Sequence, residues 1–369
     1  MLRFGLTRRT LLAAALLAGC SRKLALRFSG RLFTASAGAR GIAVSDLSEF
    51  RNILTIPLEH VPSQVLRTLR GVFVTCPDGR ALVRLDSDRL TVASTIPVPG
   101  RIAAAAVTPD GSRIVVAVEQ PDLLLVVDAA KGRIDRRIPL PVPPTALDTT
   151  DTLTAVVSAS RDALVRVSLQ DGTVAGSTVI GAPGGPLLFR MDGKAVLVGQ
   201  PAVKGIVTVD AATGVLLARL NLPFPPTRFA VNADGGQMFV TGSPEDSLAI
   251  VNTYQIEVDQ TIIGGRMPRG MAVSPARNLL LLANPSSGDI TILDIETRRL
   301  AASVHVGGAP GQILMTPDEE YGLVFQDSGD VAVIRMQTVL DRTNKTKPLF
   351  TMFPTGPAPQ SAVIVPIPA

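Results

Sequence analysis

Three arginines in the second half of the chain are the residues best suited to binding a charged ligand. Arg228 ends a proline-containing segment, and Arg266 and Arg269 lie in a similar segment about forty residues later. A guanidinium group can hold a carboxylate or a phosphate through two parallel hydrogen bonds. We therefore interpret these arginines as a candidate anion site. The alternative is that each one pairs with a local carboxylate or points into water.

Catalytic groups are scarce by comparison. The chain has two histidines, His60 and His305, which are too few for a multi-histidine metal centre. His60 follows Glu59 and could titrate near neutral pH in a solvated loop, which makes it a candidate ligand contact. No nucleophile elbow or phosphate-binding glycine loop stands out in the sequence. The sequence therefore predicts no catalytic residue, no metal site and no cofactor.

A repeat of about forty-one residues must position these side chains. Short apolar runs end at eight corresponding positions along the chain: Asp46, Asp86, Asp128, Ser168, Asp210, Asn252, Asp294 and Arg335. Further apolar runs precede and follow each position, as at residues 92–98, 103–107 and 114–118. Four short strands in each unit of about forty residues indicate a β-propeller blade.

The repeated aspartates have a structural explanation. Each one starts a turn, where a short carboxylate can accept hydrogen bonds from backbone N–H groups about two residues further on. This pattern favours turn formation over a metal array. Cys76 lies beside another turn, and with no histidine near it in sequence we expect its thiol to be unreactive.

Two segments, "VTPDGSRIVVAVEQPDLLLVVDAAKGRIDRRIPL" and "SPARNLLLLANPSSGDITILDIETRRL", resemble the YVTN family of β-propeller repeats. The resemblance extends over about residues 30–369. It implies blades arranged around a central channel, in a family whose members are often extracytoplasmic. Members commonly have seven blades whereas eight repeats are present here, so seven blades is the alternative to eight.

The end of the chain favours eight blades. The stretch "APQSAVIVPIPA" matches the innermost strand of the other repeats, and the first repeat has no such strand before it. We therefore predict an all-β fold in which residues 31–369 form one propeller of eight four-stranded antiparallel blades. The C-terminal strand would pair with the first blade, closing the ring and removing an exposed sheet edge.

Propellers usually bind ligands where the loops leading into the innermost strands gather around the channel mouth. Aligning these loops by their prolines places eight residues at one ring position: Gln64, Ala104, Ala146, Pro186, Arg228, Gly270, Gln312 and Ser361. Most are small or neutral, and Arg228 is the exception. Gln64 and Gln312 could add neutral polar contacts to an anion held by the arginines.

The first twenty residues, "MLRFGLTRRTLLAAALLAGC", indicate export. Arginines precede an apolar run at residues 11–18 that is too short to span a membrane but fits a signal peptide. Residues 17–20 resemble a bacterial lipobox, and residues 7–12 resemble a twin-arginine motif, with general secretion as the alternative. We predict a signal peptide at residues 1–19, a lipidated Cys20 with a linker to residue 30, and a membrane-anchored protein in the bacterial cell envelope, on either membrane.

Composition bears on the partners. The net charge of +5 falls to about +2 once the three arginines of the signal peptide are removed. The chain has no tryptophan and two tyrosines, so it offers few stacking platforms, and we expect no nucleic-acid partner. The loops between the second and third strands carry separated charges that could orient a protein partner: Arg40, Arg80, Arg161 and Lys204 in early repeats, and Glu245, Asp246, Asp289, Asp327 and Asp330 in later ones.

These features predict a non-enzymatic envelope lipoprotein. Its propeller would act as a scaffold or binding module for a partner protein or for a small anionic ligand at the channel mouth. The alternative is a lactonase-like hydrolase that acts on a sugar lactone or ester at the same mouth.

Overall fold

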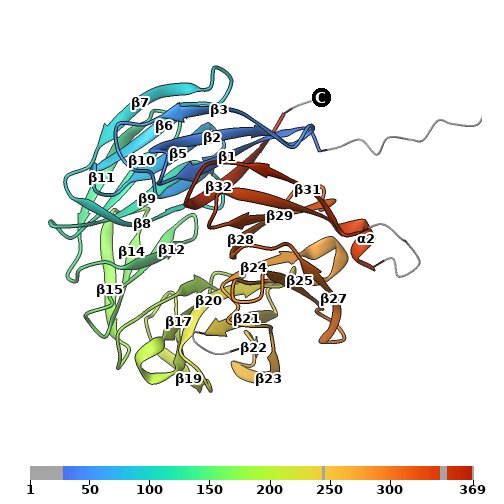
Figure 1. Cartoon of the computed structure of the whole chain (residues 1–369). Coiled ribbons are helices and arrows are strands. Elements are labelled where there is room, and N and C mark those ends of the chain that lie inside the picture. The colour runs from blue at the N-terminus through green and yellow to red at the C-terminus, as the bar shows by residue number, and fades with distance from the viewer. Residues whose placement is uncertain (1–27, 243–245, 341–346, 368–369) are drawn as a thin grey trace, which may run out of the picture.

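The computed structural model describes residues 28–242, 246–340 and 347–367, so the predicted signal peptide, the predicted lipidation site Cys20 and the loop residue Glu245 lie outside the described residues. Within these residues the chain forms eight antiparallel sheets of four strands each, arranged as blades around a central channel (Figure 1). The prediction of an eight-bladed propeller is confirmed, and the seven-bladed alternative is excluded. No helix in the described part of the chain is long and apolar enough to cross a membrane.

The strands of each blade follow one another outward from the channel. The first four blades contain, from the inside outward, β32 (Pro359–Pro366), β1 (Gly30–Ser36), β2 (Gly41–Asp46) and β3 (Arg51–Pro57); β4 (Gln64–Thr68), β5 (Gly71–Cys76), β6 (Ala81–Asp86) and β7 (Thr91–Pro97); β8 (Arg101–Val107), β9 (Arg113–Glu119), β10 (Leu123–Asp128) and β11 (Arg133–Pro139); and β12 (Ala146–Thr149), β13 (Leu153–Val157), β14 (Ala163–Ser168) and β15 (Thr173–Val179).

The other four blades have the same order. They contain β16 (Leu187–Phe189), β17 (Ala195–Gln200), β18 (Gly205–Asp210) and β19 (Leu216–Asn221); β20 (Pro226–Val231), β21 (Gln237–Gly242), β22 (Ser247–Asn252) and β23 (Glu257–Ile263); β24 (Gly270–Ser274), β25 (Leu279–Asn284), β26 (Asp289–Asp294) and β27 (Arg299–His305); and β28 (Pro310–Met315), β29 (Tyr321–Gln326), β30 (Asp330–Arg335) and β31 (Leu349–Pro354). Short helical turns are η1 (Pro201–Val203), η2 (Pro275–Arg277) and α2 (Met336–Leu340).

The ring is closed by its two ends. The C-terminal strand β32 pairs antiparallel with β1, with Leu32 opposite Ile364 and Thr34 opposite Ala362. Figure 1 shows the red end of the chain lying against its blue beginning. Because β32 supplies the innermost strand of the first blade, no blade is left with an open inner edge at this point. The predicted closure is confirmed.

The hydrophobic core lies between blades rather than within one. The middle strands are buried on both faces, whereas an outer strand such as β11 is mostly exposed. Phe33 and Val44 of the first blade pack in one cluster with Val74 and Val83 of the second. A single sheet cannot cover both of its apolar faces, so each blade is stable only between two neighbours.

The repeated aspartates form turns, as the sequence predicts. Oδ1 of Asp128 accepts hydrogen bonds from the backbone N–H groups of Ala130 at 2.9 Å and Lys131 at 2.8 Å. Asp294 accepts one from Thr297 N at 2.7 Å, and this bond lowers the pKa of the Asp294 carboxyl. Stabilisation of the ionised carboxylate by local N–H groups explains why these positions favour aspartate.

The eighth blade departs from this pattern. Arg335 stands at the position that aspartate holds in five other repeats, and it has no short acceptor side chain for a turn. The chain continues there into the helix α2 before it returns as β31. The connection between the third and fourth strands is therefore longer in this blade, a difference that the repeat spacing alone does not predict.

Candidate functional site

The central channel contains a cavity of about 1170 Å³. Seven of the eight residues that the proline alignment places at one ring position line its wall: Gln64, Ala146, Pro186, Arg228, Gly270, Gln312 and Ser361. Ala104 is not part of this wall. The repeat spacing thus identified the channel-lining position of almost every blade, although whether the cavity binds a ligand stays a prediction.

The local structure of β20 explains how Arg228 reaches the cavity. Pro226 is the first residue of β20, a position where the missing N–H of proline is tolerated. The pairing register with β21 shifts between Pro226 and Arg228, so Thr227 is an extra residue in the strand. Such a bulge re-aims side chains. Both Thr227 and Arg228 line the cavity as a result.

Arg228 and Arg269 come from neighbouring blades and lie on the same wall. Partial desolvation inside the ring lowers the pKa of Arg228, and the positive charge of Arg269 lowers it further. Arg228 is nevertheless charged, because an arginine does not deprotonate in proteins at ordinary pH. Within the described residues, no side chain or backbone group forms a hydrogen bond or ion pair with its guanidinium group.

Arg269 has one carboxylate partner. Its Nη1 lies 3.5 Å from Oδ2 of Asp327, and both side chains are more than half exposed. An ion pair with that exposure contributes little stability, about 0–1 kcal/mol. Two arginines therefore line the cavity, and one of them, Arg269, loosely holds the carboxylate of Asp327. This arrangement can accept a further anion.

The other candidate residues divide into two groups. Gln64 and Gln312 line the cavity together with the two arginines. Arg266 is exposed on the loop before β24 but is not part of the wall, and neither is His60. The His60 ring packs on Gly79, where an added Cβ would lie 2.1 Å from it. The structure thus brings four of the six candidate residues to one cavity.

The sequence did not identify the apolar part of the wall. Six half-buried apolar side chains line the cavity below the ring position: Leu147, Leu187, Leu188, Phe229, Met271 and Leu314. Asp327 and Gln360 add polar groups. All six apolar residues lie one or two positions after a ring residue, so the same alignment extended inward along each strand would have found them.

Asp148 and Cys76, whose pKa values are raised by burial, lie outside this wall. Burial raises the pKa of Asp148, on β12, while the N–H of Phe189 hydrogen-bonds to its Oδ2 at 2.7 Å. Cys76 is fully buried, and desolvation raises the pKa of its thiol to about 11. Its thiol therefore stays protonated at neutral pH, as expected for an unreactive cysteine. No group of three His, Cys, Asp or Glu side chains in the described ranges could hold a metal ion.

His305 ends β27, the outermost strand of its blade. Its Nδ1 is 2.8 Å from Oδ1 of Asp289, and the histidine side chain is exposed. This pair is on the rim of the propeller and takes no part in the cavity wall.

Comparison with known proteins identifies the fold. No protein-family model and no curated protein matches the sequence. Among solved structures, dihydro-heme d1 dehydrogenase NirN in complex with DHE has a TM-score of 0.76 at 16% identity, covering 90% of this chain and 74% of that chain.

Two further structures are similar over about three quarters of this chain. Hydrazine synthase of Kuenenia stuttgartiensis has a TM-score of 0.58 at 18% identity, covering 74% of this chain and 95% of that chain. A functionally unknown protein from Desulfotomaculum acetoxidans has a TM-score of 0.60 at 16% identity, covering 76% of this chain and 96% of that chain. At these identities the likeness extends to the β-propeller fold and not to an activity.

Proposed function

We propose that this protein binds a small organic anion at the mouth of its central channel and does so in the bacterial cell envelope, anchored through a lipid on Cys20. The observation that carries the proposal is the Arg228 guanidinium, which lines the cavity near Arg269 and has no partner among the described residues. Arg228 is exposed to solvent in the channel, and a like charge beside it is unfavourable. An anion between the two arginines would relieve this repulsion and could form bidentate hydrogen bonds.

The proposal can be tested by removing both charges. Isothermal titration calorimetry with succinate, citrate and inorganic phosphate should detect binding to the wild-type protein. Arg228→Ala with Arg269→Ala should weaken that binding at least about tenfold, since a hydrogen bond to a charged group contributes roughly 1.5–3 kcal/mol.

Arg266→Ala is the matched control, because this arginine lies on the same loop as Arg269 but not in the cavity wall. The Arg266→Ala variant should bind each anion as tightly as the wild type does. Unchanged binding in the double variant, or an equal loss in the control, would contradict the proposal.

A protein partner is a second candidate, favoured by the separated charges of the face around the mouth. Lys204 and Asp246 belong to loops of neighbouring blades, and the acidic group continues through Asp289, Asp327 and Asp330. Such a separation could set the orientation of a partner more than its affinity. Membership of the YVTN repeat family, which we also propose from the sequence resemblance, fits either role.

Hydrolysis is less well supported by the geometry. A lactonase-like reaction would need an acid–base group at the cavity. Asp148 has a raised pKa, yet one of its oxygens accepts the Phe189 N–H and the residue is not part of the cavity wall. NirN, which shares the fold, is described in complex with DHE, so a protein that contains this fold binds a ligand.

A further inference from the structure

The cavity wall changes in character with depth. The chain enters each innermost strand from the loop side, and successive residues of a strand lie about 3.3 Å further along it. Arg228, Arg269 and Gln312 lie at or near the ring position, whereas Met271 and Leu314 lie one and two residues further in. The charged and amide groups are therefore at the mouth, and an apolar band follows below them.

The apolar band is not covered by the protein itself. Leu147, Leu188, Phe229, Met271 and Leu314 pack partly against the core clusters between blades, but each remains half-buried at the cavity. Apolar surface facing water is unfavourable by about 25 cal/mol for each Å². A ligand that covered this band would gain that free energy, in addition to any ionic contact at the mouth.

The size of the cavity also limits the ligand. Sites for small molecules usually occupy about 300–1,000 Å³, and this cavity is slightly larger at about 1170 Å³. An acid of only a few atoms would contact the arginines and leave the apolar band wet. A longer molecule could contact both regions at once.

We infer that the ligand is an amphiphilic acid, with a carboxylate or phosphate head held at Arg228 and Arg269 and an apolar body lying against the band formed by Leu147, Leu187, Leu188, Phe229, Met271 and Leu314. This inference rests on the proposed function and specifies the class of anion. A cation with the same body is disfavoured, because the two guanidinium groups would repel its head.

Three probes separate the contributions of head and body. Dodecanoate carries both, acetate carries the head alone, and dodecyltrimethylammonium carries a body of equal length with a positive head. Below its micellar concentration, dodecanoate should bind the full chain at least about a hundredfold more tightly than acetate, because each buried methylene contributes roughly a further fourfold in affinity. The cation should bind at least about tenfold more weakly than dodecanoate.

Variants of the apolar band give a second readout. Met271→Gln should weaken dodecanoate binding about tenfold and leave acetate binding unchanged. Leu314→Gln, on the next blade, should have the same effect and replaces Met271→Gln if that variant is unstable. Met191→Gln is the control, because Met191 is 66% exposed and lies outside the cavity. It should bind both acids as the wild type does.

The outcomes distinguish this inference from the function on which it rests. If dodecanoate, acetate and inorganic phosphate all fail to bind, the proposed function is wrong. If acetate binds as tightly as dodecanoate, the proposed anion binding stands but the apolar body adds no affinity, and the inference is wrong. If the cation binds as tightly as dodecanoate, the cavity binds apolar chains without selecting an acid, and the inference is wrong as well. Tight binding of dodecanoate alone supports the inference.

Discussion

Arg269 takes part in two charge interactions at the channel mouth, one with Asp327 and one with Arg228. Its Nη1 lies 3.5 Å from Oδ2 of Asp327, and it contributes positive charge to the environment of Arg228. An incoming anion and Asp327 would compete for the same guanidinium group. Because the ion pair is exposed, this competition costs little, and Asp327 can be displaced readily.

Replacing Asp327 should therefore strengthen anion binding. In Asp327→Asn, succinate should bind about two- to fivefold more tightly at low ionic strength, since Arg269 is released and a negative charge is removed from the mouth. Calorimetry at about 20 mM and 300 mM salt should show that the gain shrinks as the charges are screened.

Asp289→Asn provides the comparison for this prediction. Asp289 begins a strand at the same face of the propeller but pairs with His305 at the rim. Its replacement should change succinate affinity less than twofold. A weaker affinity in Asp327→Asn would mean that Asp327 supports the site instead of competing for it.

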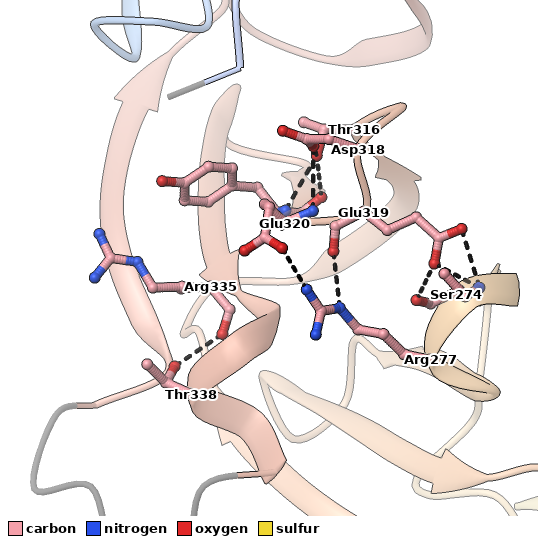
Figure 2. A network of polar contacts seen from close by, with 10 residues as sticks. Ser274, Arg277, Thr316, Asp318, Glu319, Glu320, Arg335 and Thr338 are labelled. Carbon is pink, nitrogen blue, oxygen red and sulfur yellow. Dashed lines mark hydrogen bonds and ion pairs between the residues drawn. The ribbon is translucent and has the colours of Figure 1, made fainter. Parts of the chain in front are cut away.

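On the face opposite the channel mouth, polar contacts join the seventh and eighth blades. Figure 2 shows the turn between β28 and β29 lying against η2. The Glu319 carboxylate accepts hydrogen bonds from Ser274 Oγ at 2.5 Å and Ala276 N at 3.0 Å. Arg277 donates to the Glu319 carbonyl at 3.1 Å and to Glu320 Oε1 at 2.6 Å. These contacts fix the spacing of the seventh and eighth blades. At the channel mouth, on the other face, the same two blades carry Gly270 and Gln312.

Breaking this link should destabilise the propeller. Arg277→Met keeps the apolar stem but removes both hydrogen bonds, and we expect a loss of about 1 kcal/mol in the free energy of unfolding, since the pair is only partly buried. The melting temperature should fall by roughly 2 °C in a domain of this size. Differential scanning calorimetry would measure the change.

Arg133→Met serves as the control, because the Arg133–Asp135 pair lies within one exposed outer strand. We expect no measurable change in its melting temperature. An equal effect of the two variants would show that the link between the blades adds nothing beyond a surface charge.

Features set by residues near in sequence could be predicted, whereas contacts between distant loops could not. The repeat spacing predicted the four strands of each blade, the aspartate turns and the ring position, because each depends on residues that are near in sequence. The ion pair of Arg269 with Asp327 was not predicted, since it joins two loops whose separation is set by the whole ring. The packing of His60 on Gly79 has the same origin.

At the scale of the whole molecule, the proposed lipid anchor would place the cavity close to a membrane surface. Strand β1 begins at Gly30, ten residues after Cys20. Two or more acyl chains hold a protein stably on a membrane, whereas one chain gives only marginal binding. A disc tethered by so short a segment would stay near the lipid surface, where amphiphilic acids concentrate.

Removing the proposed acylation site tests this arrangement. Expressed in a bacterial host, the wild-type chain should sediment with membranes and incorporate labelled palmitate, whereas Cys20→Ser should do neither. Cys76→Ser should retain both properties, because Cys76 is fully buried in the propeller. Membrane association without palmitate incorporation would rule out the lipid anchor and point to a different attachment.

The pairing of β32 with β1 has a consequence for the order of events in the cell. The strand that completes the first blade leaves the ribosome more than three hundred residues after its partner, so the emerging polypeptide waits with an unpaired edge throughout translation of the intervening blades. Gln360 and Ser361 of this strand are also part of the cavity wall. A nascent chain therefore lacks part of the cavity wall until residues 359–366 are in place.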